Sequence, residues 1–99
     1  MAESILGKII GGKYRLRSVL GQGAQGIVYR AEQLDSEGQV LRDVALKMVR
    51  PELSGDLGFA QQFLHEVRIT ASLHNPHIVT VYDTGRTEGG QLYCVMELV

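Results

Sequence analysis

A glycine motif, Gly-x-Gly-x-x-Gly, occupies residues 21–26 within the stretch LGQGAQGIVYRA. Glycine loops of this kind commonly surround phosphate, because a backbone without side chains can approach phosphate oxygens closely. Lys47 follows at the end of the run Val-Ala-Leu-Lys, and its ammonium can make a charge-assisted hydrogen bond to a phosphate oxygen. Glu66 lies on or beside an apolar helical stripe, where an inward-facing carboxylate requires a partner such as Lys47. Together these features indicate a site for a phosphate-bearing ligand.

The residues after the third glycine decide which kind of glycine loop this is. A dinucleotide-binding loop leads from a strand into a helix, and a Walker A loop ends in Gly-Lys-Ser or Gly-Lys-Thr, which this sequence does not contain. Residues 27–31 are rich in β-branched and aromatic side chains and therefore predict a strand. The motif accordingly predicts a glycine-rich β-hairpin. Where such a turn requires positive φ, a residue other than glycine costs about 1–2 kcal/mol.

Each of these features also has a plain structural interpretation. The glycine motif by itself is equally consistent with a mobile hairpin turn. Lys47 taken alone is consistent with a solvated lysine on a sheet face, which is the commoner location of this residue type. Glu66 is also consistent with an exposed helical glutamate within reach of Gln62 and Arg68. The choice between these interpretations depends on the rest of the chain.

The elements that must position these residues follow a β-β-β-α-β-β order. Strands are predicted at residues 14–20, 27–31, 43–49, 78–82 and 92–98. A helix is predicted over residues 59–73, with Asp56 near its start as a cap and Asn75-Pro76 as its stop. One apolar stripe along that helix contains Phe59, Phe63, Val67 and Thr70. This order predicts an α+β fold, a mainly antiparallel sheet with one packed helix.

The third predicted strand, residues 43–49, has two different faces. Alternation places Ala45 and Lys47 on one face. The other face carries Val44, Leu46 and Met48. A small side chain at Ala45 leaves room for a flat ring, while the ammonium two residues further on can reach phosphate oxygens. This face therefore suits a ligand that combines a ring with phosphate groups.

The composition restricts the class of protein. The chain has 99 residues, 44% of them apolar, which predicts one small globular domain. Its net charge of -1 predicts no affinity for nucleic acid or membrane surfaces, and it has no apolar run long enough for a signal sequence or a span. Cys94 is the only cysteine, which predicts a buried thiol and a cytoplasmic location. With His74 and His77 it would still lack a fourth zinc ligand, so no metal site is predicted.

Five motifs in order make the chain resemble the N-terminal lobe of a protein kinase, most closely the bacterial serine/threonine kinases of eukaryotic type. The matching segments are Leu20 to Val28, Val44 to Lys47, Phe63 to Glu66, Asn75 to Val79 and Tyr93 to Val99. The resemblance implies a five-stranded antiparallel sheet with one packed regulatory helix over residues 13–99. Residues 1–12 are then an N-terminal extension.

The resemblance also assigns roles to single residues. It implies that the nucleotide phosphates are covered by Gly21, Gly23 and Gly26. Lys47 would bind the α- and β-phosphates and be held in place by Glu66. The adenine pocket would be formed by the side chains of Leu20, Val28, Ala45 and Met96, the last at the gatekeeper position, and by the backbone of Glu97 and Val99. Thr70 and Val81 would join the apolar column between helix and sheet.

Two positions depart from the kinase pattern. Gln25 stands at the loop tip, where the family often has an aromatic or large apolar residue, and this weakens shielding of the phosphates from water. Thr70 stands where a larger aliphatic residue is usual, which predicts a loosely packed column.

The implied reaction is transfer of the ATP γ-phosphate to hydroxyl groups of protein substrates. The Mg²⁺ ligands and the catalytic base of a kinase lie in the C-terminal lobe, beyond the hinge at Val99, so the chain alone is expected to be inactive. One alternative is a non-catalytic module, either a solitary lobe or a pseudokinase piece that acts by binding. Another is an unrelated α+β nucleotide binder.

Overall fold

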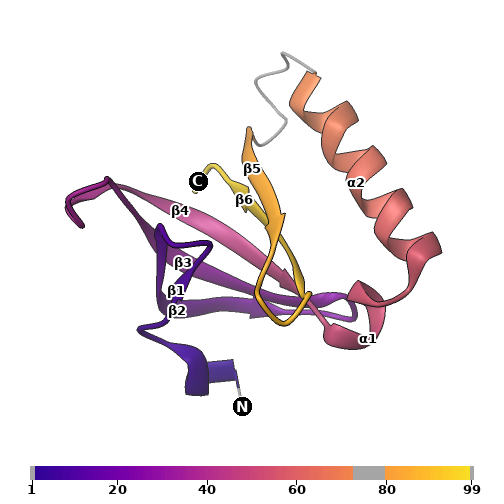
Figure 1. Cartoon of the computed structure of the whole chain (residues 1–99), viewed down its shortest axis with the longest axis horizontal. Helices are drawn as coiled ribbons and strands as arrows, with labels where there is room; N and C mark the ends of the chain where they lie inside the picture. The colour runs from indigo at the N-terminus through magenta and orange to yellow at the C-terminus, as the bar shows by residue number, and fades with distance from the viewer. Residues whose placement is uncertain (1, 73–79, 99) are drawn as a thin grey trace.

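The computed structural model describes residues 2–72 and 80–98, with the side chains of residues 69–72 left out. Its centre is a six-stranded sheet in the order β1-β2-β3-β4-β6-β5, and every neighbouring pair is antiparallel (Figure 1). The strands are β1 Ile9–Ile10, β2 Tyr14–Gln22, β3 Gly26–Leu34, β4 Val40–Val49, β5 Val81–Arg86 and β6 Leu92–Met96. The helices are the 3₁₀ turn η1 Ala2–Ile5, α1 Pro51–Ser54 and α2 Leu57–Ser72. The predicted α+β class is confirmed.

The sheet has one strand more than the predicted five. The additional strand β1 lies within the predicted N-terminal extension and pairs with Tyr14 and Arg15 of β2. Its Ile10 is buried in the core, and the Leu16 N–H donates to the Lys8 carbonyl over 2.9 Å. Burial of an isoleucine and pairing of these backbone groups hold the segment against the sheet.

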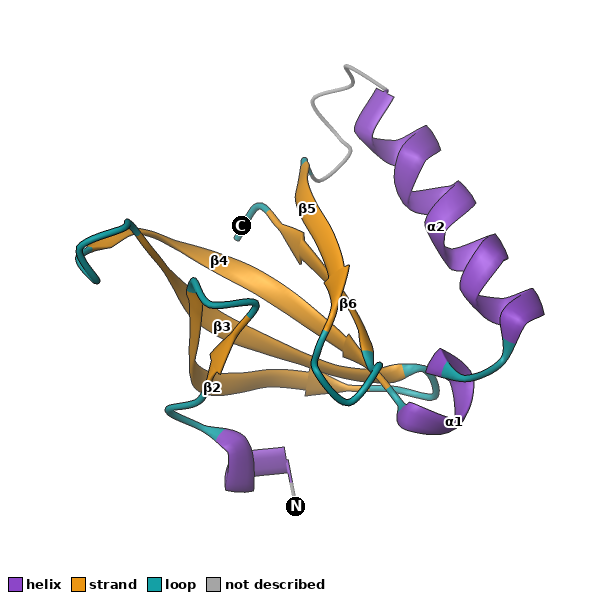
Figure 2. Cartoon of the chain, viewed as in Figure 1, coloured by secondary structure: helices purple, strands orange, loops and turns teal. Residues whose placement is uncertain are grey.

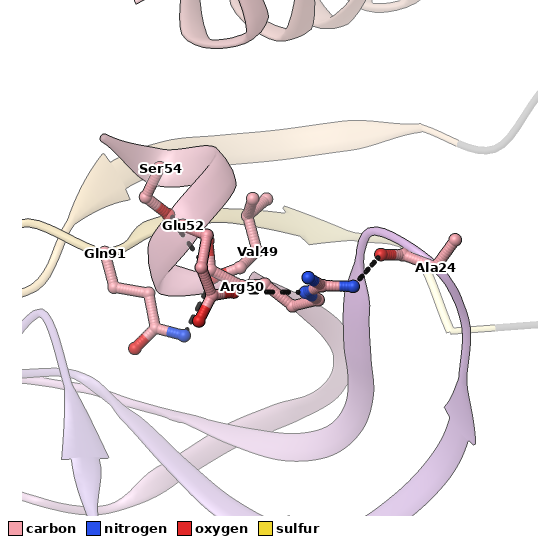
Figure 3. A network of polar contacts seen from close by, with 6 residues as sticks. All are labelled: Ala24, Val49, Arg50, Glu52, Ser54 and Gln91. Atoms are coloured by element: carbon pink, nitrogen blue, oxygen red, sulfur yellow. Dashed lines mark hydrogen bonds and ion pairs between the residues drawn. The ribbon is translucent and has the colours of Figure 1, made fainter. Parts of the chain in front are cut away.

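A second difference concerns Pro51, which follows the strand predicted over residues 43–49 at a place where no helix was predicted. It begins the short helix α1, because its fixed φ and missing N–H suit the first helical position. The Ser54 hydroxyl, 4% exposed, donates to the Arg50 carbonyl over 3.0 Å and accepts from the Leu92 N–H over 3.0 Å. The Gln91 amide also donates to the Val49 carbonyl over 2.7 Å (Figure 3). These contacts join α1 to the start of β6.

Helix α2 runs alongside β5 (Figures 1 and 2). The predicted cap is confirmed, since the Asp56 carboxylate accepts a hydrogen bond from the Phe59 N–H over 3.0 Å. Phe59 and Phe63 stack with ring centroids 6.0 Å apart, and Val67 packs on the same apolar cluster. The predicted stop at residues 75–76 and the start of the fourth predicted strand lie outside the described residues, as does the side chain of Thr70.

The two faces of β4 that alternation predicted pack into two different apolar clusters. One face joins a cluster inside the curl of the sheet, which holds Val44, Leu46, Met48, Tyr14, Leu16, Tyr29 and Val95. The other cluster lies between the sheet and α2 and holds Val49, Ala60, Phe63, Leu92 and Cys94. Because Lys47 shares the second face, the fold directs it toward the helix that carries Glu66.

Candidate functional site

The strand register places the predicted site residues in one row across the sheet. Gly21 lies opposite Val28, Val28 lies opposite Lys47, and Lys47 lies opposite Cys94. Directly opposed residues of antiparallel strands share a face. Ala45, two residues before Lys47, shares that face and lies opposite Met96. The glycine motif, the lysine and the small side chain therefore face the same side of the sheet.

The glycine motif forms a hairpin turn between β2 and β3, which confirms the predicted strand after Gly26. The Gly23 N–H donates to the Gly26 carbonyl over 2.9 Å and closes the turn. None of these loop glycines has a positive φ, so the backbone conformation is not what requires glycine here. A Cβ added at Gly21 or Gly23 would have no neighbouring atom within 4 Å. The space beside these two residues is open, as a phosphate-covering loop requires.

Gly26 is glycine for a different reason. A Cβ at this position would overlap the Met48 carbonyl oxygen and lie 3.0 Å from the Val49 Cα, both on the neighbouring strand β4. The close approach of β3 and β4 therefore excludes any side chain at Gly26.

The hairpin covers a cavity of about 410 Å³. The cavity is lined by residues 21–26 of the loop together with Val28 and Lys47. Lys47 is thus the one ammonium among the lining residues of this cavity. A cation on the floor of a cavity whose roof is a glycine-rich loop fits an anionic ligand.

A second cavity, of about 220 Å³, connects the lysine to the helix. Its lining residues are Gln25, Lys47, Phe63, Glu66, Val67, Val81, Cys94 and Met96. Lys47 and Glu66 therefore face one space, although they are far apart in the sequence. The Lys47 ammonium lies 6.0 Å from the Phe63 ring centroid, and the Gln62 amide donates to the Glu66 carboxylate over 3.1 Å. A direct pair between Lys47 and Glu66 stays a prediction.

Gln25 and Arg50 make the contacts that hold the loop tip in place. The sequence analysis gave neither residue this role. The Lys47 ammonium donates to the Gln25 amide oxygen over 2.6 Å. The Arg50 N–H donates to the Gln25 carbonyl over 2.8 Å, and the Arg50 guanidinium donates to the Ala24 carbonyl over 3.0 Å (Figure 3). The only signal in the sequence was the unusual glutamine at the tip.

The residues predicted to surround the adenine ring lie in or beside the row formed by Gly21, Val28, Lys47 and Cys94. Ala45 is buried, Val28 and Met96 are half-buried, and Leu20 is 50% exposed. The Glu97 N–H donates to the Thr80 carbonyl over 2.7 Å. Val99 lies outside the described residues. The adenine-binding roles of these residues stay predictions.

Cys94 is buried in the wall of the second cavity, 4% exposed. Burial raises the pKa of its thiol to about 11, while the nearby Lys47 charge acts in the opposite direction. Because the thiolate is the reactive form, alkylation of the folded chain by iodoacetamide at pH 8 should be about a hundredfold slower than that of the urea-unfolded chain. The folded-state rate should continue to rise until about pH 11. Mass spectrometry of timed samples measures both rates, and equal rates at pH 8 would contradict this prediction.

Among residues 2–72 and 80–98, no helix is long and apolar enough to cross a membrane. The same described residues contain no cluster of three or more potential metal-ligating side chains. His74 and His77 lie outside them.

A glycine-rich hairpin above a lysine on a curled antiparallel sheet, with one long helix beside it, defines the N-terminal lobe of a protein kinase. Residues 14–99 match the sequence family described as protein tyrosine and serine/threonine kinase. The chain belongs to this family, and the resemblance deduced from its motifs is confirmed.

Its relatives include bacterial serine/threonine-protein kinases. The chain is 41% identical over 88 residues to PknE of Mycobacterium bovis, 34% identical over 97 residues to pkn3 of Myxococcus xanthus and 37% identical over 95 residues to PrkC of Bacillus subtilis. These matches cover 89%, 98% and 96% of this chain. They span only 15%, 17% and 14% of the respective relatives.

A solved structure shows the same fold. The crystal structure of the PknI kinase domain of Mycobacterium tuberculosis superimposes with a TM-score of 0.74 at 32% identity. The match covers 95% of this chain and 36% of that kinase domain.

Proposed function

We propose that this chain is the ATP-binding lobe of a serine/threonine protein kinase. In the complete enzyme it would present ATP for transfer of the γ-phosphate to hydroxyl groups of protein substrates. The observation that carries the proposal is the position of Lys47, whose side chain lines both the cavity beneath the glycine hairpin and the cavity that contains Glu66.

Phosphoryl transfer requires mainly positioning of the phosphates and stabilisation of their charge. In this chain the backbone of Gly21, Gly23 and Gly26 would cover the phosphates and exclude water. Lys47 would bind the α- and β-phosphate oxygens. Glu66, across the second cavity, would hold the ammonium in that position. The open space beside Gly21 and Gly23 supports this assignment, because a phosphate chain can lie where no protein atom does.

The ring of the nucleotide would lie beside the same row of the sheet. Ala45 leaves space on the face that carries Lys47, and Leu20 and Val28 would contact the ring from the hairpin. Met96 would lie at the inner end of the adenine pocket. The backbone of Glu97 and Val99 would form hydrogen bonds with the edge of the adenine ring. The half-exposed state of Leu20 supports this role, since a ligand would cover it.

We assign the remaining functions to the second lobe of the kinase fold, which lies outside residues 1–99. That lobe would supply the Mg²⁺ ligands and the base that accepts the hydroxyl proton. Residues 13–99 then form the ATP-binding lobe and residues 1–12 an extension of it. The chain alone should bind ATP weakly and transfer no phosphate.

A titration of the ¹⁵N-labelled chain with ATP, followed by amide NMR spectra, tests this proposal. We expect a dissociation constant near or above ~1 mM, about -4 kcal/mol, with shifts concentrated at Gly21, Gly23, Ala45 and Lys47. Absence of shifts at these amides up to roughly 10 mM ATP, or shifts confined to other parts of the chain, would contradict it.

A further inference from the structure

The contact between Gln25 and Lys47 lies at the boundary between the two cavities. The amide oxygen of Gln25 accepts a hydrogen bond of 2.6 Å from the Lys47 ammonium, across 22 residues of sequence. These two residues line both the cavity beneath the hairpin and the cavity that contains Glu66. The loop tip therefore already occupies one donor of the cation that would bind phosphate.

The backbone of the loop tip is held independently of this contact. The Arg50 N–H bonds the Gln25 carbonyl, and the Arg50 guanidinium bonds the Ala24 carbonyl (Figure 3). The same guanidinium lies 3.2 Å from the Glu52 carboxylate, which limits its orientations. Two contacts thus fix where the tip lies and a third orients Arg50, while the Gln25 side chain extends from the tip to Lys47.

We propose that Gln25 is a built-in competitor of the nucleotide phosphates for Lys47. This inference rests on the proposed ATP-binding function. An amide oxygen is an acceptor, as a phosphate oxygen is, and the Gln25 oxygen already holds one of the three donors of the Lys47 ammonium. A phosphate that approaches Lys47 from beneath the loop meets the partial negative charge of this oxygen, so we expect ATP to displace the Gln25 side chain.

Competition of this kind has a specific signature. It weakens the binding of ligands that carry phosphates and leaves ligands without phosphate unaffected. Adenosine, which would occupy only the ring portion of the site, serves as the internal reference for ATP.

The experiment compares ATP and adenosine titrations of the full 99-residue chain with those of three variants. Gln25→Ala should lower the ATP dissociation constant about threefold to tenfold, because the competing hydrogen bond is lost. Gln25→Glu should raise it about tenfold, because the carboxylate pairs with Lys47 and repels phosphate. Gln61→Ala, the same truncation on an exposed face of α2, should change neither constant. None of the variants should change adenosine binding.

The contact itself is tested by competitive acylation of lysine side chains and mass spectrometry. Removal of Gln25 should increase the acylation rate of Lys47 several-fold relative to the exposed Lys8 in the same chain. An unchanged ratio would show that Gln25 does not occupy the Lys47 ammonium in solution and would overturn the inference.

The outcomes separate this inference from the proposed function. If wild type and variants bind neither ATP nor adenosine, the proposed function fails and the inference fails with it. If both ligands bind but Gln25→Ala leaves the ATP constant unchanged, the inference alone is overturned. Weaker ATP binding by Gln25→Ala would also overturn it, because Gln25 would then be a phosphate ligand.

Discussion

Replacing Lys47 with methionine should raise the dissociation constant of this chain for ATP by at least about tenfold. The expected loss follows from one charge-assisted hydrogen bond to phosphate, which contributes about 1.5–3 kcal/mol. Methionine keeps an unbranched apolar stem of similar length, so the packing of β4 beside Phe63 and Cys94 is retained. Adenosine binding should therefore stay within about twofold of the wild-type value. Paired NMR titrations with ATP and adenosine measure both constants.

Lys8→Met is the matched control for this experiment. Lys8 is exposed in the turn before β1 and lines neither cavity at the row of site residues. The same loss of charge there should leave the ATP constant within about twofold, which excludes a general effect of net charge. If Lys47→Met binds ATP as well as wild type does, the site assigned to the phosphates is wrong.

Gly26→Ala should destabilise the folded chain by about 2–3 kcal/mol. The new methyl group would overlap the Met48 carbonyl oxygen and press on the Val49 Cα. Both obstacles are backbone atoms of a paired strand, so they cannot move aside as the end of a flexible side chain can. Relief requires separation of β3 from β4 near their ends. Urea unfolding followed by circular dichroism measures the change in free energy.

The neighbouring variant Gly23→Ala separates packing from function. Its methyl group meets no protein atom, and its φ is not positive, so stability should change by less than about 0.5 kcal/mol. The same methyl group would narrow the open space that we propose for the phosphates, and ATP binding should weaken. Equal destabilisation by the two substitutions would refute the distinction between Gly23 and Gly26.

The sequence allowed correct prediction of the elements in which side chains alternate or recur over several residues. In β4 the alternation correctly separated the face of Val44, Leu46 and Met48 from the face of Ala45 and Lys47. The glycine hairpin was predictable because residues 27–31 are strand formers, which ruled out the loops that lead into a helix. The cap of α2 was predictable because Asp56 has a carboxylate that can accept from a helix N–H, although the helix begins at Leu57, two residues before the predicted start.

The features that the sequence did not predict are short or depend on tertiary contacts. β1 has two residues and α1 has four, which is too few for any periodicity to be visible. The bond between Gln25 and Lys47 joins side chains 22 residues apart, and no local pattern encodes it. The need for glycine at position 26 could not be predicted either, because the atom that excludes a side chain there is the Met48 carbonyl oxygen on the next strand.

Helix α1 is anchored on both sides. Arg50, the residue before its first turn, holds the glycine-loop tip, and Ser54 at its end holds the first residue of β6. The same chain continues after two residues into α2, which carries Glu66. One turn of helix thus links the tip of the glycine hairpin, the start of β6 and the base of α2.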